Sequence, residues 1–122
     1  MKDCLPGRRV LVVEDNPALA FDIDDALRES GVEVVGPALD IDSGMALLRQ
    51  DALDAAVLDI DIGGSPVWPI ARELKQEGVP FVFVSGDCDK GFPADFTDAV
   101  CLHKPAPAEA ILTTVAAVIE RG

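Results

Sequence analysis

Four short apolar runs in this chain each end on residues that could bind a cation or an anion: Glu14 with Asp15, then Asp59, Ser85 and Lys104. Carboxylates are ligands for hard cations, while a hydroxyl and an ammonium group can hold phosphate. Taken singly, each residue has an ordinary explanation as a helix cap, a turn residue or a solvated surface charge. If the runs are strands of one parallel sheet, however, their carboxyl ends meet at one edge, and the side chains form a single site.

The elements that would position these residues alternate along the chain. Short apolar runs begin near residues 10, 33, 56, 81 and 100. The segments between them repeat apolar residues at helical spacing, as expected for strands that alternate with helices. Asn16 and Pro17 open the first helix, Asp40 or Asp42 caps the second, and Pro107 begins the last.

This alternation predicts an α/β fold with a doubly wound, five-stranded parallel sheet and helices on both faces. The fourth helix is expected to be short or irregular. Residues 87–98 contain Gly91 and Pro93 and support at most one helical turn, around residues 94–96.

Composition limits the classes of function. The 122 residues are expected to form one domain over residues 8–122, after an N-terminal tail of residues 1–7 that is too short for an element. A net charge of −12 argues against nucleic-acid binding, and no apolar segment is long enough to cross a membrane. The chain has three cysteines, an odd number, and their spacing follows no known motif: Cys4, Cys88 and Cys101. This favours reduced thiols in the cytoplasm over a disulfide frame or a zinc site.

The chain from about Arg8 to Arg121 resembles the receiver domain of two-component response regulators. The matching motifs, in order and at similar separations, are Val-Val-Glu14-Asp15-Asn16, Asp59, Ser85-Gly86 and Lys104-Pro105. The resemblance implies a flavodoxin-like sheet with the strand order 2-1-3-4-5. It also implies a cytoplasmic signalling protein that is controlled by phosphorylation.

In that family, the residue that matches Asp59 accepts a phosphoryl group from a phosphohistidine on a sensor histidine kinase or a histidine phosphotransfer protein. The implied cofactor is Mg²⁺, ligated directly by Asp15 and Asp59, through water by Glu14, and by the backbone carbonyl of Asp61. The residues agree with this assignment, because crowded carboxylates repel one another unless a divalent cation lies among them. Mg²⁺ would also spread charge away from the transferring phosphoryl group.

Lys104 and Ser85 would hold the phosphate after transfer. The resemblance implies that Lys104 pairs with Asp59 at rest and with a phosphate oxygen afterwards, while Ser85 donates its hydroxyl to another oxygen. The bond between Lys104 and Pro105 is expected to be cis. The switched surface is expected to bind a downstream protein, and the candidates for this signal output are Gly86, Asp87, Phe92, Phe96, Cys101 and Pro105.

One position departs from the family pattern. A Tyr or Phe usually stands three residues before the strand-five lysine, whereas this chain has Cys101 there and contains no tyrosine. The stretch Phe83–Cys88 partly resembles a subgroup of single-domain receivers that carries Phe-Ala-Thr-Gly-hydrophobic-Tyr. We expect phosphate to act on the loop of residues 87–98 by repacking Phe92 and Phe96. The alternative is that both rings only anchor the loop to the core.

Two other functions match parts of the pattern. Asp59-Ile60-Asp61 resembles the Asp-x-Asp motif of haloacid-dehalogenase phosphatases, although that family carries the motif on its first strand and its further acids come later. A receiver-shaped module that binds a partner without phosphate is the other alternative, and the intact site residues argue against it. As a receiver, the chain is expected to catalyse only its own phosphorylation and dephosphorylation, and a homodimer is compatible with the sequence.

Overall fold

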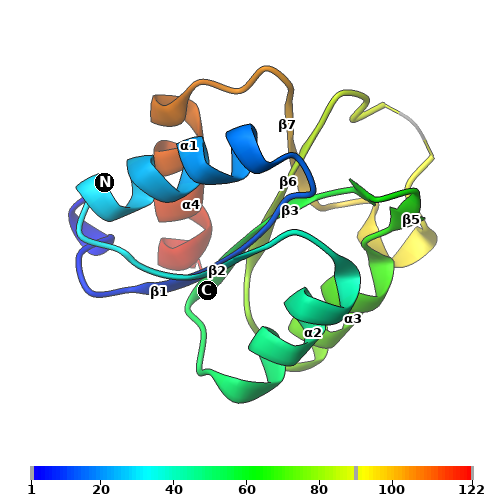
Figure 1. The fold of residues 1–122 in the computed structure, drawn as a ribbon, viewed down its shortest axis with the longest axis horizontal. Coiled ribbons are helices and arrows are strands. Elements are labelled where there is room, and N and C mark those ends of the chain that lie inside the picture. The colour runs from blue at the N-terminus through cyan, green and yellow to red at the C-terminus, as the bar shows by residue number, and fades with distance from the viewer. Residues whose placement is uncertain (1, 90, 122) are drawn as a thin grey trace.

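The computed structural model describes residues 2–89 and 91–121, which build a five-stranded sheet in the order β2-β1-β3-β6-β7 (Figure 1). Every neighbouring pair of strands in this sheet is parallel. The strands are β1 (Arg9–Val13), β2 (Glu33–Ala38), β3 (Ala55–Asp59), β6 (Phe81–Ser85) and β7 (Val100–His103). The predicted fold class and strand order are confirmed.

Two helices cover each face of the sheet. Helices α1 (Pro17–Glu29) and α4 (Ala108–Arg121) lie on one face, and α2 (Ile41–Gln50) and α3 (Trp68–Gln76) lie on the other (Figure 1). Asn16 caps α1 with its side chain, and Asp40, one of the two predicted candidates, caps α2. None of the described helices is both long and apolar enough to span a membrane.

The sheet separates two hydrophobic cores, and β3 is buried along its whole length. Alternate residues of β1 show why both cores are continuous: Val10 and Val12 face α1 and α4, whereas Leu11 and Val13 face α2 and α3. A strand buried on both faces must be apolar throughout. The polar residue that ends such a strand is therefore held on a rigid support.

A small hairpin follows β3 that the sequence did not predict as strands. Strand β4 (Asp61–Ile62) pairs with β5 (Ser65–Pro66) in antiparallel fashion. Gly63 and Gly64 form the connection, with φ of +59° and +87°. Two-residue hairpin turns of this kind need positive φ at both positions, which glycine adopts without steric cost.

The N-terminal segment is part of the fold, so the prediction that it forms no element is wrong. Residues Lys2–Cys4 form a 3-10 helix, η1, and Leu5 is fully buried in the core beside α4. Burial of a leucine side chain stabilises the folded state by about 1.5–3 kcal/mol, and this contribution favours the packed position of the segment.

Among the described residues between β6 and β7, the helical structure is one 3-10 turn, η2 (Ala94–Phe96), in agreement with the predicted short fourth helix. Phe96 is buried and stacks on Trp68, with ring centroids 5.6 Å apart. Phe92 and Phe83 complete the cluster, with centroids 5.5 Å apart. The rings therefore anchor this connection to the core in this state, and their repacking on phosphorylation stays a prediction.

Two of the cysteines are paired, so the prediction of reduced thiols is wrong for them. Cys88 and Cys101 form a disulfide, with Cα atoms 5.8 Å apart, and Cys4 lies outside it. The register of the sheet explains the contact. Cys101 in β7 lies opposite Phe83 in β6, and the loop that leaves β6 turns back toward this position. Spacing along the chain carried no such information, because the pairing depends on how the loop folds.

Candidate functional site

Asp59 is placed by the end of the central strand β3. Its backbone pairs with Val84 of β6, and the residue is only 8% exposed. Oδ2 accepts a hydrogen bond from Nζ of Lys104, at 3.0 Å. Lys104 follows directly after β7, so two strands that are not neighbours supply this pair.

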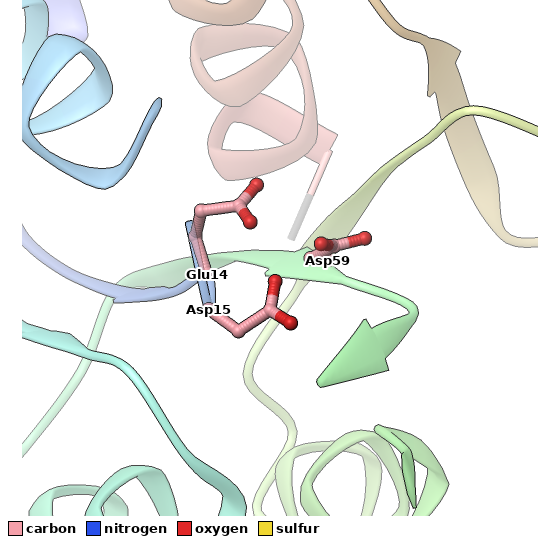
Figure 2. Close-up of side chains that lie close together, drawn as sticks. All are labelled: Glu14, Asp15 and Asp59. Carbon is pink, nitrogen blue, oxygen red and sulfur yellow. The ribbon is translucent and has the colours of Figure 1, made fainter. Parts of the chain in front are cut away.

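Glu14 and Asp15 follow β1, the strand next to β3, and Figure 2 shows their side chains beside that of Asp59. Glu14 is 1% exposed, and its Oε1 lies 2.8 Å from Nζ of Lys104. Its other oxygen accepts a hydrogen bond from the backbone N–H of Asn16, at 3.0 Å. The predicted acids and the predicted lysine are thus brought together.

Asp15 is oriented by the hairpin. Its Oδ2 accepts a hydrogen bond from the backbone N–H of Gly63, at 2.9 Å. Sequence reasoning recognised the Gly63-Gly64 turn but missed this contact. The available signal was the glycine pair itself, because two positive φ values reverse the chain close to the strand end that carries Asp59.

The three carboxylates could hold a metal ion. Glu14, Asp15 and Asp59 each offer an oxygen, and these oxygens lie within 4.8 Å of one another. An all-oxygen donor set of carboxylates suits a hard divalent cation such as Mg²⁺. Within the described residues 2–89 and 91–121, this is the sole group of acids, histidines and cysteines close enough for such a site.

The environment affects the acids differently. Burial raises the pKa of Glu14, and Lys104 and the Asn16 N–H only partly offset this effect. The Gly63 N–H lowers the pKa of Asp15. For Lys104, burial favours the neutral amine, but hydrogen bonds to Glu14 and Asp59 outweigh burial and raise its pKa. The lysine is therefore held in its cationic form, whereas burial disfavours the ionised form of Glu14.

Ser85 ends β6 at the same edge of the sheet. Its Oγ accepts a hydrogen bond from the backbone N–H of Asp87, at 3.1 Å, and its carbonyl accepts one from the Lys104 N–H, at 2.8 Å. The Lys104–Pro105 bond is cis, as predicted, and a second cis bond, Gly36–Pro37, was not predicted. Ser85 and Lys104 are therefore tied to each other through the backbone beside Asp59.

Not every predicted residue lies in this cluster. The Asp61 side chain is exposed and is outside the acidic group, and the role of its carbonyl as a ligand stays a prediction. Gly86, Asp87 and Pro105 are exposed near the same edge. Their part in signal output also stays a prediction.

The family model for the response regulator receiver domain matches residues 10–116. The chain belongs to this family. Protein PilH of Pseudomonas aeruginosa is 27% identical over 118 residues, a match that covers 91% of this receiver and 97% of PilH. Transcriptional regulatory protein PdtaR of Mycobacterium tuberculosis is 28% identical over 82 residues, which cover 67% of the receiver but only 40% of PdtaR.

Solved structures show the same fold. The solution structure of SdrG from Sphingomonas melonis Fr1 has a TM-score of 0.79 and 29% identity, and the match covers 93% of the receiver and 97% of SdrG. The receiver domain of the sensor histidine kinase PA1611 from Pseudomonas aeruginosa, which has a magnesium ion in its active site cleft, gives a TM-score of 0.78 at 20% identity. That match covers 93% of this receiver and 98% of the PA1611 domain.

These results favour a receiver domain over a haloacid-dehalogenase phosphatase. The second acid of the Asp59-Ile60-Asp61 motif is exposed and lies outside the acidic group, whereas the acids of β1 lie beside Asp59. The match to the receiver-domain family, over residues 10–116, includes the acids of β1 and Asp59. Membership of the single-domain subgroup suggested by Phe83–Cys88 stays a prediction.

Proposed function

We propose that this receiver accepts a phosphoryl group on Asp59 and uses it to switch its affinity for a protein partner. The observation that carries the proposal is the geometry around Asp59. Its carboxylate is held by Lys104 at 3.0 Å and lies in a group of acids that could bind a cation. A nucleophile oriented by an ammonium group beside a cation site has the components that phosphoryl transfer needs.

In the transfer, an oxygen of Asp59 attacks phosphorus, and the bond from phosphorus to the donor's histidine nitrogen breaks. The imidazole leaves with the electron pair of that bond. Lys104 keeps its proton throughout and moves its hydrogen bond from Asp59 to a phosphate oxygen. Ser85 supplies a hydroxyl at the next strand end, and this requires its Oγ–H to turn toward Asp59.

Glu14, Asp15 and Asp59 fit Mg²⁺, because their oxygens converge and their charges repel one another without a cation. When bound there, Mg²⁺ withdraws negative charge from the transferring phosphoryl group. The Gly63 N–H keeps the Asp15 carboxylate in place, and burial keeps Glu14 close to the cluster. The chain thus catalyses its own phosphorylation and dephosphorylation but turns over no separate substrate.

A groove of about 670 Å³ between α1 and α4 opens beside Glu14 and Lys104. Leu19 and Ile111 are among its apolar lining residues, and Asp22 is among the acids in its lining. We assign this groove to the phosphodonor, a sensor histidine kinase or a histidine phosphotransfer protein. Its opening beside Glu14 and Lys104 supports this assignment, because both residues adjoin Asp59. Such partners are cytoplasmic, and the net charge of −12 argues against nucleic acid as the downstream target.

The test is incubation with acetyl phosphate and Mg²⁺, followed by intact-mass measurement. The wild type is expected to gain the mass of one phosphoryl group, and Asp59→Asn is expected to gain none. Asp61→Asn is the matched control, because Asp61 is a nearby carboxylate that is exposed and outside the cluster. Equal labelling of Asp59→Asn and wild type would overturn the assignment. Failure of all three proteins to label would favour the module that binds a partner without phosphate.

A further inference from the structure

The disulfide lies next to the residues that are proposed to bind phosphate. Cys88 comes three residues after Ser85, and Cys101 comes three residues before Lys104. The backbone hydrogen bond from Lys104 N–H to the Ser85 carbonyl, at 2.8 Å, joins the other ends of these two short segments. Residues 85–88 and 101–104 therefore form a closed ring at the edge of the sheet.

This ring restrains the loop that leaves Ser85. The Ser85 Oγ accepts the Asp87 N–H at 3.1 Å, and the next residue, Cys88, is bonded to β7. If Ser85 turned toward a phosphate on Asp59, this hydrogen bond would have to break or Asp87 would have to move with it. The disulfide opposes such movement, because Cys88 stays fixed to Cys101.

Contacts other than the disulfide hold the rest of the segment between β6 and β7 against the protein. Phe96 is 2% exposed within the aromatic cluster. Asp95 forms an ion pair with Arg72 at 2.9 Å, and its carbonyl accepts a hydrogen bond from Lys75 at 2.6 Å. These contacts hold η2 independently of the sulfurs. Cleavage of the disulfide would therefore release the loop next to Ser85 without detaching the whole segment.

Cys88 and Cys101 are both half-buried residues, so neither is enclosed completely in the core. In a cytoplasmic protein, a disulfide is more typical of a transient or sensing bond than of a permanent one. Cys101 also occupies the position where the resemblance leads us to expect an aromatic ring. A residue that could form a covalent bond thus replaces one that could only repack.

We propose that Cys88 and Cys101 are a reversible redox site that sets how far phosphorylation of Asp59 can move the loop after Ser85. The oxidant is a small-molecule disulfide of the glutathione class. One cysteine thiolate attacks it and releases one thiol, and the second cysteine thiolate then attacks the mixed disulfide and releases the other. The two cysteine thiols lose two protons and two electrons, and the oxidant gains them as two thiols.

The first part of the test does not depend on phosphorylation. The wild-type chain is equilibrated in buffers of reduced and oxidised glutathione at graded ratios, quenched in acid, denatured and alkylated, and its mass is measured. The chain has three cysteines, so the reduced form takes three alkyl groups and the oxidised form takes one, on Cys4. As the proportion of oxidised glutathione rises, we expect the number of alkylated cysteines to fall from three to one, with both sites lost together. If Cys88 and Cys101 stay disulfide-bonded, or stay reduced, at every ratio, the proposal of a reversible redox site is wrong.

The second part measures amide exchange of residues 86–89 with and without beryllofluoride and Mg²⁺. This arm rests on the proposed function. In the reduced wild type and in Cys88→Ser/Cys101→Ser, beryllofluoride is expected to change the exchange rates of this loop. In the oxidised wild type the change is expected to be roughly tenfold smaller, because the restrained loop opens less often. Cys4→Ser should behave as the wild type in both redox states.

The outcomes distinguish the two proposals. Equal responses of the oxidised and reduced wild type would overturn the redox coupling while leaving the proposed function intact. No response of the reduced wild type would overturn the proposed function and the coupling together, whereas the alkylation series would still decide whether the cysteines are a redox site. Because the main comparison uses one protein in two redox states, it does not depend on whether the serine variant folds.

Discussion

Lys104 is the counter-charge of Glu14: its Nζ lies 2.8 Å from Oε1 of Glu14, a residue that is 1% exposed. Removal of the ammonium group leaves the buried Glu14 carboxylate without compensation. We expect Lys104→Met to lower the free energy of unfolding by about 1–3 kcal/mol in the absence of divalent cations. Urea denaturation monitored by circular dichroism measures this change.

The control for this prediction is Arg28→Met, which removes an ion pair within α1 between Asp24 and Arg28, whose own side chain is 54% exposed. Helical ion pairs at this i,i+4 spacing contribute about 0.3–0.5 kcal/mol. Similar losses for Lys104→Met and Arg28→Met would show that Glu14 does not depend on the lysine.

Glu14 gives the second prediction, because burial raises its pKa. An acid whose pKa is higher in the folded state than in the unfolded state favours folding when it is protonated, and this contribution is lost as pH rises through the folded-state pKa. Without Mg²⁺, Glu14→Gln is therefore expected to be more stable than wild type at neutral pH. The difference should shrink as pH falls toward the usual range of a glutamic acid.

Thermal unfolding between acidic and neutral pH, with and without Mg²⁺, checks this prediction. Mg²⁺ is expected to stabilise the wild type more than Glu14→Gln, because the variant has lost one of the converging carboxylates. If the variant is less stable than wild type at neutral pH without Mg²⁺, Glu14 is not strained by its burial.

The hairpin turn gives the third prediction. Gly63→Ala places a side chain at φ +59°, which costs about 1–2 kcal/mol, and it disturbs the N–H that holds Asp15. Gly78→Ala is a matched control, with φ +74° and, like Gly63, no atoms within 4 Å of an added Cβ. Both variants should lose similar stability in urea, but Gly63→Ala alone should bind Mg²⁺ more weakly in calorimetric titrations. Equal Mg²⁺ affinities of the two variants would show that the hairpin does not contribute to the cation site.

The groove between α1 and α4 gives the fourth prediction. Leu19 is 37% exposed and lines this groove, whereas Leu39 is 41% exposed and does not. Leu19→Asp is expected to slow transfer from a phosphorylated histidine phosphotransfer protein that labels the wild type, because a charge replaces apolar contact area. Labelling by acetyl phosphate should be unchanged, and Leu39→Asp should behave as wild type with both donors. Normal transfer to Leu19→Asp would place the donor elsewhere.

The parts of the fold that the sequence predicted are those governed by local patterns. The run Ala55–Leu58 is apolar because β3 is buried on both faces, so its boundaries and the position of Asp59 at the carboxyl end of the strand follow directly. Lys104 could be assigned to the same site because strand ends in a parallel sheet converge. Such inferences need no knowledge of how any loop is folded.

The features that were missed depend on loops and on contacts between distant segments. The Gly63 N–H reaches Asp15 only because the hairpin reverses the chain at that point. Cys88 meets Cys101 because the loop after β6 turns back along the edge of the sheet, and neither residue stands in a recognisable cysteine motif. Leu5 is buried through packing on α4, which no periodicity within residues 1–7 could indicate.

The position of Leu5 has a practical consequence for anyone who shortens the protein. A version that starts at Arg8, where the family resemblance begins, would lack a side chain that fills space against α4, and the void would weaken the helix that borders the groove. Solubility tags and fluorescent labels are therefore better attached ahead of residue 1 than in place of the opening residues. Comparisons of donor affinity between trimmed and untrimmed versions would otherwise mix a packing defect with a difference in recognition.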